Sequence, residues 1–268
     1  MSLAAALSRL APQTIPFEPG HVWLAGAGPG HIGCLTLDVL AAIATADTIV
    51  YDALVDPAVL RAADGADLHF VGKRGGKPSA SQAEINALLI RLARQGQRVL
   101  RLKGGDPNLF GRGGEEALEL ATAGIPFRFL PGITSAFGAL AATGIPATLR
   151  GVNKAIILAT GHAAGTAEDL DWAALAATGQ PIVVYMGLAK LPVISAALIA
   201  GGADPSLPAA VIVAATTREE RRITASLGEI ALAAQAAGAT SPALIVIGEI
   251  VAEGERLRAL MTAARVPA

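Results

Sequence analysis

Residues 99–116 read VLRLKGGDPNLFGRGGEE. The run 99–102 predicts a β-strand that ends at Lys103, after which the chain opens into two glycines, an aspartate and a proline. Ligands of open α/β sheets gather at the carboxyl ends of strands, so this loop is placed to bind one. Gly105 permits a close backbone approach, and Asp106 can bind a ribose hydroxyl or an amino group. A structural Asp-Pro turn is the alternative, but the concentration of glycines favours a ligand site.

The rest of the chain repeats this alternation of short apolar runs with longer helical patterns. Strands are predicted at 22–25, 48–51, 68–71, 99–102, 127–130, 155–160, 182–186, 210–215 and 243–248. Helices are predicted at 35–46, 81–95, 114–123, 134–142 and 191–200. Ser81 and Glu84 have the spacing of a capping box. The alternation predicts two α/β domains with mixed, largely parallel sheets.

The domain boundary is predicted near residues 150–154. Residues 1–20 are interpreted as a flexible N-terminal tail, because Arg9 is their only basic residue and they contain no apolar run suited to an export signal. The sequence therefore predicts two domains after this tail: an N-terminal α/β domain at 21–150 and a C-terminal α/β domain at 151–268.

Composition argues against several classes of protein. A formal net charge of −1 gives no general attraction for nucleic acid. The longest uncharged stretch, 129–149, contains two prolines and three glycines and is a poor membrane helix. The single cysteine, Cys34, cannot form an internal disulfide, and four histidines without paired spacing offer no metal site. We therefore expect a soluble, cytoplasmic protein that binds no metal, membrane or nucleic acid.

Two further glycine-containing loops follow predicted strands. GAGPG at 26–30 indicates a dinucleotide, another adenosyl ligand or an ordinary turn. The full dinucleotide fingerprint needs a glycine where His31 stands, and Pro29 lacks the N–H that would contact a pyrophosphate. PGITSA begins a helix, so Thr134 and Ser135 are either N-caps or ligand contacts.

Together these motifs resemble the tetrapyrrole methylase family, most closely its members that methylate uroporphyrinogen III. The similarity spans about residues 22–250, and its most specific parts are VGKR, RLKGGDP with FGRGGEE, and YMG. The matching segments are GAGPG (26–30), LTL (35–37), Tyr51-Asp52, VGKR (71–74), QAEIN (82–86), RLKGGDP (101–107), FGRGGEE (110–116), PGITSA (131–136), GIP (144–146), TGH (160–162), YMG (185–187), ATT (215–217) and PAL (242–244).

The resemblance implies that S-adenosylmethionine binds in a cleft between two α/β domains and leaves as S-adenosylhomocysteine. Enzymes of this kind are homodimers that methylate C2 and C7 of uroporphyrinogen III in succession, which gives precorrin-2 for cobalamin or sirohaem synthesis. The implied cofactor contacts are Pro29, Gly105, Asp106, Phe110, Thr134, Ser135, Met186, Ala215 and Ala243.

The same resemblance assigns acid–base roles to Asp52, as proton acceptor, and Lys73, as proton donor. A helix N-cap at Asp52 and a solvated side chain at Lys73 are the alternatives. Because the substrate carries eight carboxylates, its pocket must supply cations and hydrogen-bond donors. The substrate-binding candidates are Arg74, Lys77, Arg112, Arg150 and Tyr185. Arg218, Arg221 and Arg222 are interpreted as a solvated cluster.

Other functions stay open from the sequence. A methylase of a later corrin intermediate, or of RNA ribose, would belong to the same family. A nicotinamide-dependent oxidoreductase would use the GAGPG loop but leaves RLKGGDP unexplained. A non-catalytic dimeric binding module would hold the cofactor without turning it over.

Overall fold

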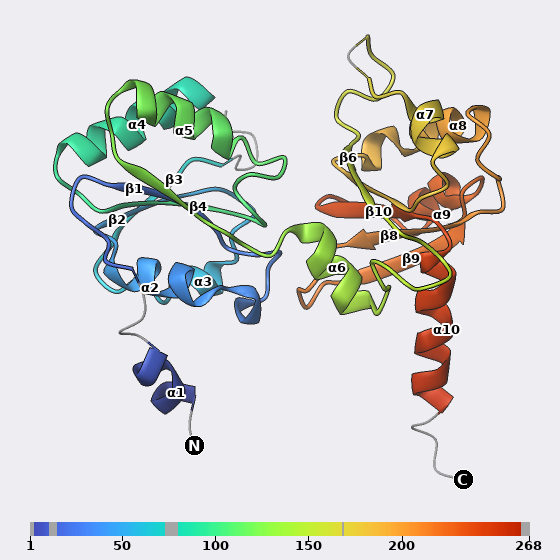
Figure 1. Ribbon diagram of the computed structural model, residues 1–268, viewed down its shortest axis with the longest axis horizontal. Helices are drawn as coiled ribbons and strands as arrows, with labels where there is room; N and C mark the ends of the chain where they lie inside the picture. Colours follow the sequence, from blue (N-terminus) through green and yellow to red (C-terminus); the bar gives the residue numbers. More distant parts are fainter. Residues whose placement is uncertain (1–2, 11–14, 73–79, 168, 264–268) are drawn as a thin grey trace. The chain divides into compact units, whose positions relative to one another are not determined.

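The computed structural model describes residues 3–10, 15–72, 80–167 and 169–263. Contacts between residues divide the chain into two compact units, Met1–Ser135 and Ala136–Ala268. Each unit contains a five-stranded sheet with helices packed against it, so the predicted α/β class is confirmed (Figure 1). None of the described helices is long and apolar enough to cross a lipid bilayer.

The sheet of the first unit is parallel throughout, in the strand order β3-β2-β4-β1-β5. Its strands are β1 (Val22–Gly26), β2 (Thr48–Tyr51), β3 (Asp67–Phe70), β4 (Val99–Lys103) and β5 (Phe127–Leu130). The sequence predicts all five to within one residue at each end. Because the strands run the same way, the loops after β1, β2, β4 and β5 all leave from one edge of the sheet.

Helices cover both faces of this sheet, with α2 and α3 on one face and α4 and α5 on the other (Figure 1). The helices are α1 (Leu3–Leu10), the 3₁₀ turn η2 (Ile32–Cys34), α2 (Leu37–Thr45), α3 (Pro57–Leu60), α4 (Gln82–Arg94) and α5 (Gly113–Thr122). The predicted capping box of α4 is confirmed: Glu84 N donates to Ser81 Oγ at 3.3 Å, and Ser81 N donates to Glu84 Oε2 at 2.7 Å.

β4 separates two apolar clusters, because successive side chains of a strand point to opposite faces. Leu100 and Leu102 belong to the cluster under α2 and α3, whereas Val99 belongs to the cluster under α4 and α5. Arg101 and Lys103 share the parity of Val99, so they point toward the α4 and α5 face, and both are buried. Two cations therefore lie inside the unit, just below the carboxyl edge of the sheet.

The sheet of the second unit is mixed, in the order β6-β7-β10-β8-β9. Its strands are β6 (Ile157–Thr160), β7 (Ile182–Tyr185), β8 (Pro208–Val213), β9 (Arg221–Ser226) and β10 (Ala243–Ile247). β6 and β7 pair in parallel, but the pairs β7–β10, β10–β8 and β8–β9 are antiparallel. The prediction of largely parallel sheets therefore holds for the first unit and not for the second. The sequence also missed β9, which follows β8 through a short loop and therefore returns antiparallel to it.

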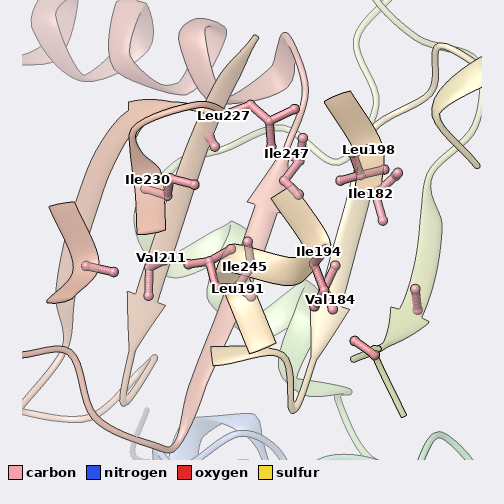
Figure 2. Close-up of a cluster of buried hydrophobic side chains, with 14 of the residues drawn as sticks. Ile182, Val184, Leu191, Ile194, Leu198, Val211, Leu227, Ile230, Ile245 and Ile247 are labelled. Atoms are coloured by element: carbon pink, nitrogen blue, oxygen red, sulfur yellow. The ribbon is translucent and has the colours of Figure 1, made fainter. Parts of the chain in front are cut away.

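Helices α7, α8 and α9 bury apolar side chains against one face of this second sheet (Figure 2). Ile182 and Val184 of β7 both belong to this cluster, as the period of two residues in a strand requires. Ile194 of α8 and Ile245 of β10 lie at its centre in Figure 2. The helices of the unit are α6 (Ser135–Thr143), α7 (Trp172–Ala177), the 3₁₀ turn η3 (Leu188–Lys190), α8 (Leu191–Ala200), α9 (Ile230–Ala236) and α10 (Ile250–Ala263).

The division between the units falls at the start of α6, whereas the sequence places the domain boundary after residue 150. The reason is that α6 packs with the second unit. Ala136 N donates a hydrogen bond to the Tyr185 hydroxyl at 2.9 Å, and Arg222 NH1 of β9 donates one to Thr143 O at 2.9 Å.

The first twenty residues are not a tail throughout their length, in contrast to the prediction. Leu3–Leu10 form α1, and Phe17 is buried with its ring stacked on Trp23 at 4.1 Å between centroids. Gly20 N also donates to Gln97 O at 3.1 Å. The packed part of the first unit therefore begins before residue 21, because an aromatic side chain upstream of β1 completes its core.

Candidate active site

Two loops at the carboxyl edge of the parallel sheet are joined backbone to backbone. Gly28 and Gly105 exchange two hydrogen bonds, from Gly28 N to Gly105 O at 3.1 Å and from Gly105 N to Gly28 O at 2.7 Å. Ala27 N also donates to Lys103 O at 2.7 Å. Backbone hydrogen bonds therefore join the GAGPG loop after β1 to the GGDP loop after β4.

The loop after β5 approaches them so closely that no side chain fits between. A Cβ atom added to Gly26 would overlap Gly105 O and lie 2.6 Å from the Gly132 Cα. A Cβ atom added to Gly132 would also overlap Gly105 O and lie 2.7 Å from the Gly26 Cα. Glycine is required at both positions because the three backbones touch.

The loops after β1, β4 and β5, which meet at Gly26, Gly105 and Gly132, form a three-loop junction. Asp106 forms hydrogen bonds within it. Its Oδ1 accepts a hydrogen bond from Asn108 N at 2.8 Å, and its Oδ2 accepts one from Gly132 N at 3.0 Å. An ionised carboxylate has about four acceptor positions, so about two remain for a ligand. The residue is only half-buried, and the arrangement therefore fits the predicted contact with a ribose hydroxyl or an amino group.

Other predicted cofactor residues of the first unit lie next to Gly105. A Cβ atom added at Gly105 would lie 3.3 Å from Ser135 Oγ and 3.9 Å from the Thr134 Cα. Pro29 directly follows Gly28, which is bonded to Gly105. The structure thus brings together residues from the loops after β1, β4 and β5 that the resemblance assigns to one ligand.

The GAGPG loop is not built as a dinucleotide site. The Gly28 N–H is already bonded to Gly105 O, and the chain passes through η2 before α2 begins with Thr36 as its N-cap. In a dinucleotide fold the glycine loop runs straight into a helix whose free N–H groups face the pyrophosphate. This geometry argues against the nicotinamide oxidoreductase.

Asp52 follows β2 at the same edge of the sheet. Its Oδ1 accepts a hydrogen bond from Leu54 N at 3.1 Å, and its Oδ2 lies 3.7 Å from the NH2 group of Arg101. The Asp52 side chain is 26% exposed, so it can meet a ligand while it touches the interior. It is not the N-cap of the helix that follows, because Asp56 caps α3.

Beneath Asp52 lies a buried cluster of charges that the sequence prediction missed. Arg101 Nε and Lys103 Nζ each lie 3.1 Å from Glu116 Oε1, and Glu116 is fully buried. Burial lowers the pKa of the Lys103 ammonium and the charge of Arg101 lowers it further, while Glu116 acts in the opposite direction. The signal was present in the sequence: two basic residues at alternate positions of a strand share one face.

Arg112, a predicted substrate contact, is paired within the first turn of α5. Its Nε and NH2 donate to the two carboxylate oxygens of Glu115 at 2.9 and 2.6 Å. This bidentate hydrogen bonding raises the pKa of Arg112 and lowers that of Glu115. Both side chains are 55% exposed, so a substrate carboxylate would compete with Glu115 for the guanidinium. The other basic candidates of this unit, Lys73, Arg74 and Lys77, lie outside the described residues.

The predicted ligand contacts of the second unit gather at one edge of its sheet. β10 begins at Ala243 beside the end of β8, and β7 ends at Tyr185 on the other side of β10. Met186 follows β7 and is exposed, while Ala215 follows β8 and is buried. Arg150 lies in an exposed turn between α6 and β6.

Strained backbone in the described chain concentrates in the loops that carry predicted site residues. A left-handed backbone costs an L-residue roughly 1–2 kcal/mol, and such residues cluster at functional sites. The non-glycine residues with positive φ are Phe110 (53°), Arg112 (60°), Met186 (54°), Ala214 (46°) and Thr216 (66°). Three of them are themselves predicted contacts, and the other two flank Ala215. No sequence pattern shows this feature, because none of these residue types prefers a positive φ.

The interpretation of Arg222 as a solvated side chain is wrong. Its side chain is 8% exposed, and its NH1 donates to Thr143 O at 2.9 Å. Its NH2 lies 2.7 Å from Glu255 Oε1, an ion pair without hydrogen-bond geometry. Arg222 therefore joins β9 to α6 and α10, whereas Arg218 is exposed as expected.

Comparison with known proteins places these features in a family. The model of the tetrapyrrole (corrin/porphyrin) methylases matches residues 21–231. The chain belongs to this family. A uroporphyrinogen-III C-methyltransferase of Sinorhizobium sp is 48% identical over 247 residues, which cover 91% of this chain and 87% of that protein. A siroheme synthase of Stutzerimonas stutzeri is 44% identical over 256 residues, 95% of this chain and 54% of the relative. The chain thus spans about half the length of that siroheme synthase.

Solved structures agree with this membership. A uroporphyrin-III C-methyltransferase from Thermus thermophilus, complexed with S-adenosylhomocysteine, is 38% identical with a TM-score of 0.73 and covers 86% of this chain and 98% of its own. A cobalt precorrin-4 methyltransferase has a TM-score of 0.79 at 23% identity, with 87% of this chain and 96% of its own covered. The second likeness supports the fold alone.

Proposed function

We propose that this protein is an S-adenosylmethionine-dependent C-methyltransferase that converts uroporphyrinogen III to precorrin-2 by methylation at C2 and C7. The observation that carries this proposal is the 48% identity to a uroporphyrinogen-III C-methyltransferase over 91% of the chain. The three-loop junction around Asp106 supports it, because it provides free acceptor positions where the resemblance places the cofactor.

S-adenosylmethionine supplies an electrophilic methyl group on a sulfonium. We assign its recognition in the first unit to the Asp106 carboxylate, with the neighbouring backbone and side chains of the junction. The proposed cofactor contacts of the first unit are Pro29, Gly105, Asp106, Phe110, Thr134 and Ser135. Those of the second unit are Met186, Ala215 and Ala243.

The protein's own groups would then position the ring and remove a proton. A pyrrole carbon forms a bond to the methyl carbon as the carbon–sulfur bond breaks, and the electron pair of that bond stays on sulfur. The methylated ring is left cationic and returns to neutrality by losing one proton, which we assign to the partly exposed Asp52 carboxylate. Lys73 is the proposed proton donor.

Carboxylates of the substrate require cations and hydrogen-bond donors at the same site. The proposed substrate contacts are Arg74, Lys77, Arg112, Arg150 and Tyr185. Among them, Arg112 is 55% exposed at the start of α5, and a substrate carboxylate would bind it by displacing Glu115 from the guanidinium.

We further propose that the enzyme acts as a homodimer in the cytoplasm and supplies cobalamin or sirohaem synthesis. The single cysteine agrees with a reducing compartment. The siroheme synthases among the relatives agree with a sirohaem route.

Mass spectrometry of the product tests the function. Uroporphyrinogen III is generated without oxygen and incubated with the protein and methyl-labelled S-adenosylmethionine, and the methyl groups on the ring are counted. Two per ring are expected. Asp52→Asn should lower turnover, whereas Asp56→Asn should not, because asparagine also caps a helix well and Asp56 caps α3.

Two results would overturn the proposal at different levels. An unmethylated ring, together with tight binding of S-adenosylhomocysteine, would exclude uroporphyrinogen III and favour a later corrin intermediate. Binding of NADH in place of S-adenosylhomocysteine would exclude the methyltransferase altogether.

A further inference from the structure

The cluster of Arg101, Lys103 and Glu116 has features that a packing role does not explain. The three side chains are 3%, 6% and 0% exposed, respectively. Removing each of these charges from water costs on the order of several kcal/mol, even after the protein relaxes around it. Apolar side chains of similar volume would often stabilise such a position as well or better. Their occurrence between β4 and α5 therefore points to a task beyond holding the first unit together.

The hydrogen bonds of the cluster restrain Arg101 more than a single ion pair would. Its Nε donates to Glu116 Oε1 at 3.1 Å, and its NH1 donates to the backbone oxygens of Val50 at 3.4 Å and Leu102 at 3.2 Å. One edge of the guanidinium is thus held by α5 and another by the backbones of β2 and β4. Its NH2 remains, and this group lies 3.7 Å from Asp52 Oδ2.

The formal charges of the buried cluster also indicate that Asp52 belongs with it. Arg101 and Lys103 carry two positive charges, and Glu116 carries one negative charge, so the buried cluster has a net charge of +1 by itself. Asp52 completes its neutrality, and it does so from a 26% exposed position at the carboxyl edge of the sheet. A line of contacts therefore runs from the interior, through Arg101, to the partly exposed carboxylate of Asp52.

Register explains why these residues meet. β2 pairs with β4 in parallel, with Val50 opposite Arg101 and Tyr51 opposite Leu102. Asp52 directly follows the last paired residue of β2, Tyr51, and lies close enough for its charge to act on the Lys103 ammonium. α5 lies over the face of β4 that carries Arg101, which brings Glu116 within reach of both cations.

We propose that Arg101 and Glu116 are positioning residues for proton transfer: Glu116 holds the Arg101 guanidinium, and Arg101 orients the Asp52 carboxylate toward the substrate. Lys103 Nζ donates to the same Glu116 oxygen at 3.1 Å and so helps to hold this carboxylate in place. This inference rests on the proposed function of Asp52 as the proton acceptor. It assigns no substrate contact to Arg101, Glu116 or Lys103, since all three are buried.

A double-mutant cycle tests the inference through turnover. kcat and KM are measured for the wild type, Arg101→Gln, Asp52→Asn and the double variant, with uroporphyrinogen III and S-adenosylmethionine as substrates. Arg101→Gln should lower kcat by about 10- to 100-fold, as expected when a catalytic group is misplaced by about 1 Å. KM for S-adenosylmethionine and the affinity for S-adenosylhomocysteine should not change, because the three-loop junction around Asp106 is left intact. In the Asp52→Asn background, Arg101→Gln should have no further effect.

A matched control is available next to the same strand. Arg98 immediately precedes β4, and its NH2 also pairs with an aspartate oxygen, Asp47 Oδ1 at 2.7 Å, but at the opposite edge of the sheet. Arg98→Gln should leave kcat unchanged. Should Arg101→Gln fail to fold, Arg101→Lys keeps the charge while it shortens the reach toward Asp52, and it should show the same fall in kcat with unchanged binding of S-adenosylhomocysteine.

The outcomes separate this inference from the proposed function. Full activity of Asp52→Asn would remove the proposed proton acceptor, and the positioning role with it. If Asp52→Asn is impaired but Arg101→Gln lowers kcat by the same factor in both backgrounds, the function of Asp52 stands and the positioning role is overturned. Wild-type kcat in Arg101→Lys would also overturn it, because charge alone would then suffice.

Discussion

The Asp106 carboxylate joins the loop after β4 to the loop after β5, since its Oδ2 accepts a hydrogen bond from Gly132 N at 3.0 Å. Its second oxygen accepts from Asn108 N, so both oxygens face backbone donors. One side chain thereby contributes to the shape of the junction and offers its remaining lone pairs to a ligand. The stability of the first unit and the binding of the cofactor should accordingly respond to the same substitution.

Asp106→Asn should weaken both properties. An amide has one oxygen, so one of the two backbone N–H groups would face an NH2 group, which costs about 1–3 kcal/mol. We expect a lower free energy of unfolding in urea, and at least about tenfold weaker binding of S-adenosylhomocysteine by calorimetry, which corresponds to about 1.4 kcal/mol. Asp204→Asn, in an exposed turn where Asp204 accepts from Ser206, is the control and should bind normally. Unchanged binding by Asp106→Asn would remove Asp106 from the cofactor site.

Gly132→Ala should destabilise the first unit, whereas Gly114→Ala should stabilise it. A Cβ atom at Gly132 would overlap Gly105 O, and displacing a packed backbone costs about 1–3 kcal/mol. A Cβ atom at Gly114 in α5 meets nothing within 4 Å, and alanine gains about 0.5–1 kcal/mol over glycine in a helix. Chemical denaturation of both variants measures the two signs. Equal stability of the two would contradict the close contact of the three loops.

Arg222→Met should lower the free energy of unfolding of the second unit by about 1–3 kcal/mol, because it removes a hydrogen bond to Thr143 O and an ion pair to Glu255. Arg218→Met, at an exposed position, should change it by less than about 0.5 kcal/mol. Thermal unfolding of the pair compares them directly. A similar loss in both variants would show that the burial of Arg222 contributes nothing specific.

Stability should depend on pH through Asp47. Its hydrogen bonds with the Arg98 side chain and backbone hold the pKa of this carboxyl below its ordinary value. A lowered pKa in the folded state means that the stabilisation is present above the unfolded pKa of about 3.9 and is lost as the pH falls through the folded pKa. Both side chains are more than a third exposed, so we expect about 0.2–1 kcal/mol from the pair. Urea unfolding should show Asp47→Asn less stable than the wild type at pH 7, and the difference should vanish in acid. A difference that persists below the folded pKa would contradict this assignment.

Local signals were sufficient for most of the first unit. β2 (Thr48–Tyr51) and β5 (Phe127–Leu130) have the predicted bounds, and so does α8 (Leu191–Ala200) in the second unit. Each is bounded by glycine, proline or polar residues, whose effect on the backbone acts within a few positions. The capping box at Ser81 is local for the same reason, since its hydrogen bonds span three residues.

Features that depend on pairing between distant strands were predicted less well. β9 carries two arginines and no continuous apolar run, so it forms only because β8 provides an antiparallel edge. The mixed direction of the second sheet follows from the same pairing. The charged neighbours of Arg222 along the chain indicate a surface position, but the partners that bury it, on α6 and α10, are remote in sequence.

The sequence by itself determined the α/β class, the family and the three glycine-containing loops at the carboxyl edge, because apolar periodicity and glycine and proline positions act over short distances. Only the tertiary structure decided how those loops meet, with Gly26, Gly105 and Gly132 in backbone contact. It also decided that Arg101 reaches Asp52 from a buried cluster with Glu116. The physical reason is strand register: parallel pairing brings residues about fifty positions apart onto one face of the sheet, where buried charges must find partners that their sequence neighbours cannot supply.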